Sequence, residues 1–74
     1  MKLPKNLSGL ELVKILTKHY GWQAHRREGS HITLKKENAA SLLTVPLHKQ
    51  LDTGTLLAIL RKAKIERDDF IEKV

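Results

Sequence analysis

The sequence of 74 residues contains no cysteine, only three aromatic residues and only two prolines. The absence of cysteine excludes disulfide bonds and metal sites built on thiolates. Long apolar runs are also missing: none approaches the ~20 residues that a membrane-spanning helix needs. The N-terminal stretch MKLPKNLSG lacks the apolar core of a signal peptide. We therefore expect a cytoplasmic protein without a membrane segment.

The length limits what the chain can build. A chain of this size buries only ~60% of the surface that it exposes when unfolded, so its core is small. Residues 1–74 are expected to form one domain, and no second domain is available to create a deep cleft. On size alone we expect no dinucleotide or other small-molecule cofactor.

The charge balance points to a class of partner. Fourteen Lys and Arg residues oppose eight Asp and Glu residues, which gives a formal net charge of +6. So large a surplus on a short chain attracts polyanions. Nucleic acid or an acidic protein is therefore favoured as a partner over the alternative that the charge serves solubility alone.

A first helix is predicted over residues 9–20. Ser8 and Glu11 have the spacing of a capping box, in which each side chain accepts from the backbone amide of the other residue. Gly21 follows at the position where a left-handed residue commonly ends a helix. Apolar residues recur at helical spacing over this range, at Leu10, Val13, Leu16 and Tyr20, widened by Leu12 and Ile15.

Two alternating segments, residues 22–26 and 30–35, predict a β-hairpin around Gly29. A two-residue turn at residues 28–29 would mix apolar and polar side chains on both faces of the hairpin. A three-residue turn at residues 27–29, with a left-handed Gly29 in a bulge, separates them. We prefer the second arrangement, because it collects the apolar residues on one face: Trp22, Ala24, Ile32 and Leu34.

The remaining segments predict one more strand and two helices. The strand covers residues 42–45 and is ended by Pro46, which cannot donate to a ladder. Asp52 or Thr53 caps a second helix, and residues 67–73 are expected to form a short final helix.

The predicted order α-β-β-β-α, with an extra C-terminal helix, indicates an α+β fold. The simplest packing is a three-stranded antiparallel sheet with both main helices on one face. The other face then stays open. In the preferred register this open face carries His31, with His25 directly opposite.

Five short motifs follow one another along the chain: Gly21-Trp22, Arg26, GSH at residues 29–31, PLH at residues 46–48 and GTL at residues 54–56. In this order and at these distances they resemble the HicA-type toxins of toxin–antitoxin pairs, also called the YcfA-like family, over nearly the whole chain. The resemblance implies a double-stranded-RNA-binding-domain-like fold and a small ribonuclease that cuts messenger RNA (mRNA) and stops translation. It also implies a HicB-type antitoxin that covers the site.

The resemblance assigns the catalytic role to His31, the histidine of the GSH motif. Histidine suits RNA cleavage without a metal, because an unperturbed pKa of ~6.5 lets it take the proton of a ribose 2′-OH. Taken alone, His31 is more often explained as a solvated strand residue, and the resemblance is what favours catalysis. No spacing of His and carboxylate residues fits a metal site, so a metal-dependent nuclease is not expected.

The neighbours of His31 are weaker candidates, and each has an ordinary alternative. Gly29 and Ser30 either let a phosphate come close or serve the turn alone. His48 is either a catalytic or substrate-contacting group or an exposed loop residue. For a phosphate contact, the resemblance favours Arg26, whereas the register favours Arg27.

Basic residues near the ends of the second strand and the second helix form a candidate RNA track: Lys35, Lys36, Arg61, Lys62 and Lys64. Such charge runs are as often merely solvated faces. Trp22 is expected in the core, because three aromatic residues do not favour a base-stacking platform.

Two other functions stay open at this point. One is a non-catalytic double-stranded-RNA-binding module, which the RKAK stretch at residues 61–64 would suit. The other is a degenerate toxin kept as an interaction protein. The GSH motif favours the ribonuclease over both, since a pure binding module has no need of it.

Overall fold

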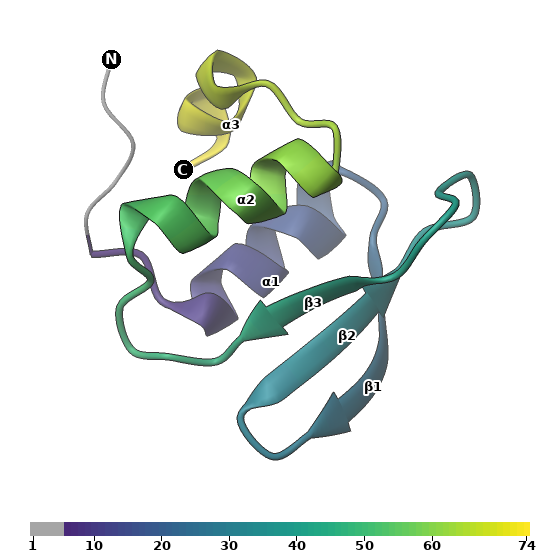
Figure 1. Ribbon diagram of the computed structural model, residues 1–74. Coiled ribbons are helices and arrows are strands. Elements are labelled where there is room, and N and C mark those ends of the chain that lie inside the picture. Colours follow the sequence, from purple (N-terminus) through teal and green to yellow (C-terminus); the bar gives the residue numbers. More distant parts are fainter. Residues whose placement is uncertain (1–5) are drawn as a thin grey trace.

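The computed structural model describes residues 6–74, so the predicted start of the domain at residue 1 lies outside the described residues. The elements follow the order α1 (Gly9–His19), β1 (Gln23–Glu28), β2 (His31–Lys35), β3 (Leu43–Pro46), α2 (Thr53–Lys62) and α3 (Arg67–Lys73) (Figure 1). The strands form one antiparallel sheet with β2 in the centre. The predicted α+β order is therefore confirmed. No helix within residues 6–74 combines the length and apolar character needed to cross a membrane.

Local sequence signals set both ends of α1. The Glu11 amide donates to Ser8 Oγ at 3.1 Å, and the Ser8 amide donates to Glu11 Oε1 at 3.3 Å, so the predicted capping box is present. Gly21 has a φ of +77°, and the amide of the next residue donates to the Leu16 carbonyl. This left-handed cap ends the helix as the sequence predicted.

The turn of the hairpin differs from the prediction. Gly29 and Ser30 form a two-residue turn, and Glu28 pairs directly with His31. Gly29 has a φ of +57°, whereas Ser30 has no positive φ. Glycine at the first central position is typical of a type II′ turn, whose twist matches that of the flanking strands. The expected three-residue turn is therefore wrong, although the left-handed Gly29 is confirmed.

A β-bulge at His25 accounts for the separation of apolar and polar side chains that the predicted three-residue turn was intended to explain. The β1–β2 pairing shifts between Ala24 and Arg26, so His25 is the extra residue. His25 is consequently not opposite His31, which corrects the second part of the register prediction. Ala24 was expected to be buried, but it is exposed because β1 is an edge strand.

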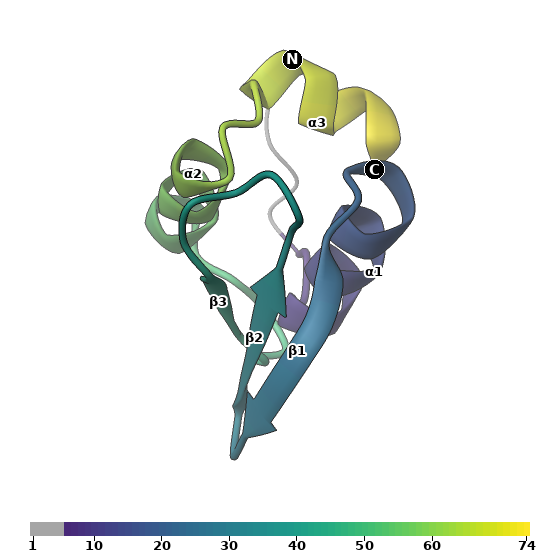
Figure 2. The ribbon, with the colours of Figure 1, turned by 90° about the vertical axis from the view of Figure 1, so that its right-hand side faces the viewer.

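α1 and α2 lie on one side of the sheet, with α3 beyond them (Figure 2). Both main helices pack against β3, and α1 also reaches β1. The core comes from the helices, the helix-facing side of the strands and the adjoining loops: Leu7, Leu12, Val13, Leu16, Trp22, Leu34, Leu43, Val45, Leu51, Leu56, Ile59, Leu60 and Phe70. Leu10, which was expected in the apolar stripe, is 55% exposed instead. No helix of the described chain covers the opposite face of the sheet.

The start of α1 touches the end of β3. The Gly9 amide donates to the His48 carbonyl at 2.9 Å, and a Cβ placed at Gly9 would lie 2.0 Å from the Pro46 carbonyl oxygen. Only glycine fits such a close approach between two backbones. Pro46 is the β3 partner of His31, so this contact fixes the strand beside that histidine.

Side-chain hydrogen bonds hold the ends of α2 and α3. Asp52 precedes α2, and its carboxylate accepts from the Thr55 hydroxyl, which is the main reason that the pKa of Asp52 is lowered. The Tyr20 hydroxyl donates to Asp69 Oδ2 at 2.6 Å and ties α3 to the end of α1. Burial, together with this hydrogen bond, raises the pKa of Tyr20 to about 12.

Candidate functional site

The open face of the sheet carries a shallow hollow that contains the predicted catalytic histidine. All three strands and the residue before β3 contribute to its lining: His25, Arg26, Glu28, His31, Thr33, Leu42 and Thr44. We call this the outer hollow. His31 is exposed there, as the sequence predicted. A wide, shallow surface of this kind accepts a polymer lying across it more readily than an enclosed small molecule.

Three groups of different chemistry meet in the outer hollow. Glu28 is the direct β1 partner of His31, and opposed residues of two antiparallel strands have Cβ atoms ~4.5–5.5 Å apart. Arg26 Nε lies 2.6 Å from Glu28 Oε1, and both side chains are about two-thirds exposed. An imidazole, a carboxylate and a guanidinium therefore lie side by side. They can supply a base, a second proton-exchanging group and a phosphate ligand.

The bulge explains why Arg26, and not Arg27, belongs to this group. Arg27 pairs with the helix-facing Ile32, whereas Arg26 pairs with Thr33 on the outer side. The register argument for Arg27 is thus wrong, and the position that the resemblance favoured lines the hollow. The bulge also brings His25 to this face, but about 10 Å along β1 from the partner of His31, at ~3.3 Å per residue.

The structure separates the remaining candidates from the outer hollow. Gly29 and Ser30 form the turn next to His31, and the Ser30 carbonyl accepts from the Leu47 amide at 2.6 Å. His48 is exposed but does not line the hollow. Its carbonyl accepts from the start of α1, and its side chain helps to lower the pKa of Asp52.

Glu28 is the functional candidate that the sequence analysis missed. The signal was present, because a Gly-Ser pair between two strand-like segments is typical of a two-residue hairpin turn. That turn alone would have placed Glu28 opposite His31. The assumption of a bulge-free β1 concealed it.

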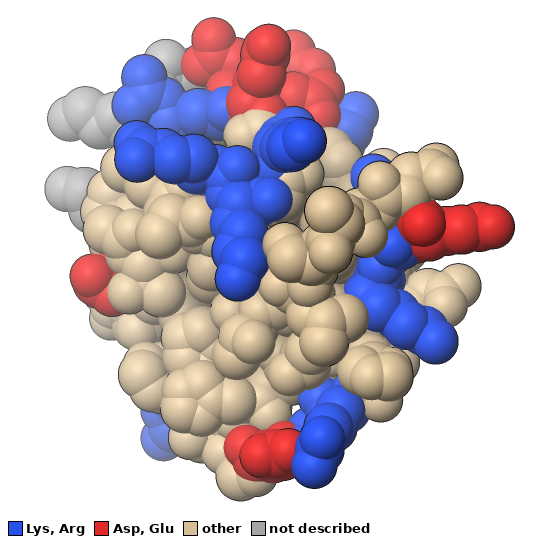
Figure 3. All heavy atoms as spheres, turned by 45° about the vertical axis from the view of Figure 1, so that its right-hand side comes forward, with Lys and Arg blue, Asp and Glu red and all other residues tan. Residues whose placement is uncertain are grey.

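The residues of the candidate RNA track lie in three places. Lys35 follows His31 and Thr33 on the outer side of β2, and Arg61 lies in the last turn of α2. The other three lysines line a second hollow, between the β2–β3 loop and the end of α2: Lys36, Lys62 and Lys64. Figure 3 shows Lys and Arg side chains gathered in the upper part of one face, directly below a cluster of Asp and Glu, with others toward its right-hand and lower edges.

The titratable residues do not form a metal site in the described chain. Within residues 6–74, no group of three or more His, Asp or Glu side chains is arranged to hold a metal ion.

Comparison with known proteins extends the resemblance over most of the chain. The family model described as the HicA toxin of bacterial toxin–antitoxin systems matches residues 9–65. This range runs from the start of α1 to just beyond α2 and contains the whole sheet. A search among curated proteins finds no match.

Proposed function

The chain belongs to the HicA toxin family of bacterial toxin–antitoxin systems, and we propose that it is an endoribonuclease that cleaves mRNA without a metal ion. In this proposal His31 is the general base, and the outer face of the sheet is the surface on which the RNA lies. The observation that carries the proposal is the exposed position of His31 on the central strand, beside Arg26 and Glu28.

The proposed reaction uses His31 as the base and solvent water, which reaches the exposed hollow, as the proton source for the leaving oxygen. His31 takes the proton of the ribose 2′-OH, and the 2′ oxygen forms a bond to the adjacent phosphorus. The bond from phosphorus to the 5′ oxygen breaks, and the leaving oxygen takes up a proton. The products are a 2′,3′-cyclic phosphate and a 5′-OH end.

Arg26 is the proposed ligand of the scissile phosphate. A guanidinium can donate two parallel hydrogen bonds to phosphate oxygens and stabilise the charge that develops on them. In the free protein Glu28 holds Arg26 in place on the outer face. Because the pair is exposed, it contributes little to stability, so a phosphate can replace the carboxylate at low cost.

The family implies an antitoxin partner, and we propose that a HicB-type antitoxin covers the outer hollow. An acidic surface can compete with RNA for the same basic residues, because electrostatic complementarity steers both to one site. In this arrangement inhibition requires no change in the toxin fold.

The test in cells compares induced expression of the wild-type chain with His31→Ala, and with His19→Ala as the matched control. His19 is an exposed histidine at the end of α1, outside the outer hollow. The wild type and His19→Ala are expected to arrest growth and degrade mRNA, whereas His31→Ala is expected to do neither while accumulating as a folded protein. Growth arrest by His31→Ala with intact mRNA would instead favour a non-catalytic RNA-binding module.

A further inference from the structure

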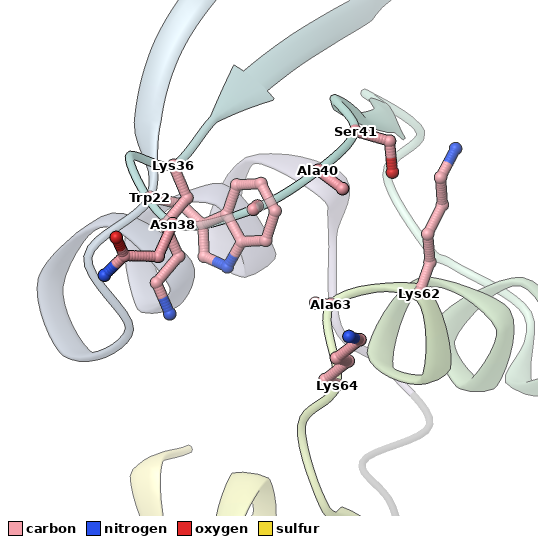
Figure 4. Close-up of a pocket in the computed structure, with 9 residues that line it drawn as sticks. Trp22, Lys36, Asn38, Ala40, Ser41, Lys62, Ala63 and Lys64 are labelled. Carbon is pink, nitrogen blue, oxygen red and sulfur yellow. The ribbon is translucent and has the colours of Figure 1, made fainter.

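The second hollow has features that the outer face does not explain. It lies between the β2–β3 loop and the C-terminal end of α2, on the helix side of the sheet (Figure 4). Its volume is about 290 Å³, roughly ten times the ~30 Å³ that one water molecule occupies in the liquid. The space is therefore large enough for a phosphate group with part of its hydration shell. We call it the lysine hollow.

The lining of the lysine hollow is basic and contains no carboxylate. Lys36, Lys62 and Lys64 line it, and the other polar side chains are Asn38 and Ser41. Within residues 6–74 the one ion pair joins Arg26 to Glu28, so none of these three lysines is paired with an acid there. Lys36 Nζ lies 6.0 Å from the centre of the Trp22 ring, within reach of a cation–π interaction.

A buried donor without a protein partner faces this space. Trp22 is 3% exposed, and its Nε1–H finds no acceptor among the described residues. In Figure 4 the indole nitrogen is turned toward the opening between Lys36 and Lys64. Because an unpaired buried N–H costs free energy, we expect this N–H to donate to an acceptor from outside the protein.

The backbone conformation of Lys64 is a further feature of this hollow. Lys64 has a φ of +60°, the left-handed conformation that glycine adopts most easily at the end of a helix. It is the one non-glycine residue of the described chain with a positive φ. A lysine at such a position keeps a cation at the rim of the hollow at the expense of an easier backbone.

Two nearby negative features do not cancel this charge. The C-terminal end of α2 carries about half a negative elementary charge, but the carbonyls of residues 59–61 accept from the amides of residues 63–65. Glu66 and Asp69 line an adjoining hollow that shares Lys36 and Lys64 with this one, but neither lines the lysine hollow itself, and Asp69 already accepts from the Tyr20 hydroxyl. Three ammonium groups therefore dominate the lysine hollow.

We infer that the lysine hollow binds a phosphate of the RNA backbone away from the cleaved bond, with Trp22 Nε1 as the buried donor. The inference rests on the proposed function for its choice of RNA as the source of the phosphate. The two hollows lie on either side of the segment that leads into β3, because Ser41 lines one and its neighbour Leu42 lines the other. His31 and Lys35 are separated by about 13 Å along β2, at ~3.3 Å per residue. An RNA strand that crosses the outer face can thus bend around the β2–β3 loop and reach the lysine hollow.

The single tryptophan makes the test direct. The chain has one indole N–H, so its resonance in a proton–nitrogen correlation spectrum needs no assignment among several. The protein is the full chain carrying His31→Ala, which prevents cleavage. The probes are inorganic phosphate and a single-stranded RNA oligonucleotide, with sodium chloride at matched ionic strength as the control. We expect the indole resonance to shift saturably with phosphate and with RNA, and not with chloride.

Variants separate a binding role from a structural one. Lys64→Gly suits the left-handed backbone, so its melting temperature is expected to equal or exceed that of the unsubstituted protein. The shift of its indole resonance with phosphate is expected to be smaller, and its Kd for RNA is expected to rise several-fold. The slope of log binding constant against log salt concentration is expected to decrease in magnitude by about 0.7, the value for one lost phosphate contact on a single strand. Lys14→Ala, on the exposed side of α1, is the control and should leave the indole shift unchanged.

Several outcomes would overturn the inference. An indole resonance that neither phosphate nor RNA moves would show that water alone satisfies Trp22. A shift with RNA that Lys64→Gly leaves intact would place the phosphate elsewhere. A shift with an acidic peptide and none with RNA would assign the hollow to a protein partner. None of these results depends on cleavage, so the ribonuclease proposal stands or fails separately.

Discussion

The close approach of Gly9 to the end of β3 yields a prediction with a calculable size, for Gly9→Ala. The added Cβ would lie 2.0 Å from the Pro46 carbonyl oxygen, about 1.4 Å closer than the 3.4 Å at which ordinary contact begins. It would also lie 2.8 Å from Leu47 Cα. Both obstacles are backbone atoms, so no side-chain rotation relieves them. α1 has to move away from β3, which strains the bond from the Gly9 amide to the His48 carbonyl.

The expected cost is about 2–3 kcal/mol, at the upper end of the range for overpacking. For a domain of this size that corresponds to a fall in melting temperature on the order of 10–20 °C. Gly54→Ala is the matched control, because the nearest atom to a Cβ at Gly54 is the Asp52 carboxylate at an ordinary 3.5 Å. Gly54 is the second residue of α2, where the glycine penalty is smaller than in a helix interior, so this change should stabilise the protein by about 0.5 kcal/mol or less.

Thermal and urea denaturation of the two variants and the wild type measure these differences. We expect opposite signs, with Gly9→Ala destabilised and Gly54→Ala slightly stabilised. Equal stability of Gly9→Ala and the wild type would show that α1 does not begin against the end of β3. The packing that fixes the strand beside His31 would then have to be revised.

The remaining predictions concern pH and the outer hollow. The pKa of Tyr20 in the folded protein is about 12, above its ordinary 10.0. The stabilisation that Tyr20 contributes is therefore complete below pH 10 and is lost as the pH rises toward 12. Unfolding free energies between pH 9 and 12 should show this loss in the wild type and not in Tyr20→Phe. Glu28→Gln should release Arg26 and tighten RNA binding measured in the His31→Ala background, while stability changes by less than about 1 kcal/mol; weaker RNA binding would argue against Arg26 as a phosphate ligand. Binding of an acidic antitoxin should weaken with added salt and should protect the β1–β3 face from hydrogen exchange; protection confined to α3 would contradict occlusion of His31.

Features that depend on a few neighbouring residues were predicted correctly from the sequence. The capping box of Ser8 and Glu11 and the left-handed Gly21 place both ends of α1 to within one residue. The side-chain alternation of the hairpin predicted an exposed position for His31. The preferred turn put His31 on the polar face, and the other turn was rejected because it mixed apolar and polar side chains on both faces.

The register of β1 could not be obtained in the same way. A bulge at His25 needs no special residue, so the alternation of side chains gives no sign of it. Two errors compensated: a turn one residue too long and a strand assumed to be regular. Together they kept Ile32 and Leu34 on the correct face but assigned Arg27 the place of Arg26.

The lysine hollow was beyond sequence analysis for a different reason. Burial of Trp22 was predicted, and it is confirmed at 3% exposure. The unpaired state of its N–H depends on which segments surround the ring. These are Lys36, residues 38–41 and residues 62–64, which lie far from Trp22 in the sequence. Only their meeting in space shows that the surrounding side chains offer positive charge and no carboxylate, and that none of them accepts from the indole N–H.

The most direct measurement of the proposed mechanism is the rate of RNA cleavage by the purified protein in the presence of EDTA, for the wild type and His31→Ala. Loss of a positioned general base typically lowers a rate by 10²–10⁴-fold. We expect the wild type to cleave in EDTA and to leave 2′,3′-cyclic phosphate and 5′-OH ends, and His31→Ala to be slower by that factor while still binding RNA. Cleavage by His31→Ala at the wild-type rate, or wild-type cleavage that requires added magnesium, would contradict the mechanism.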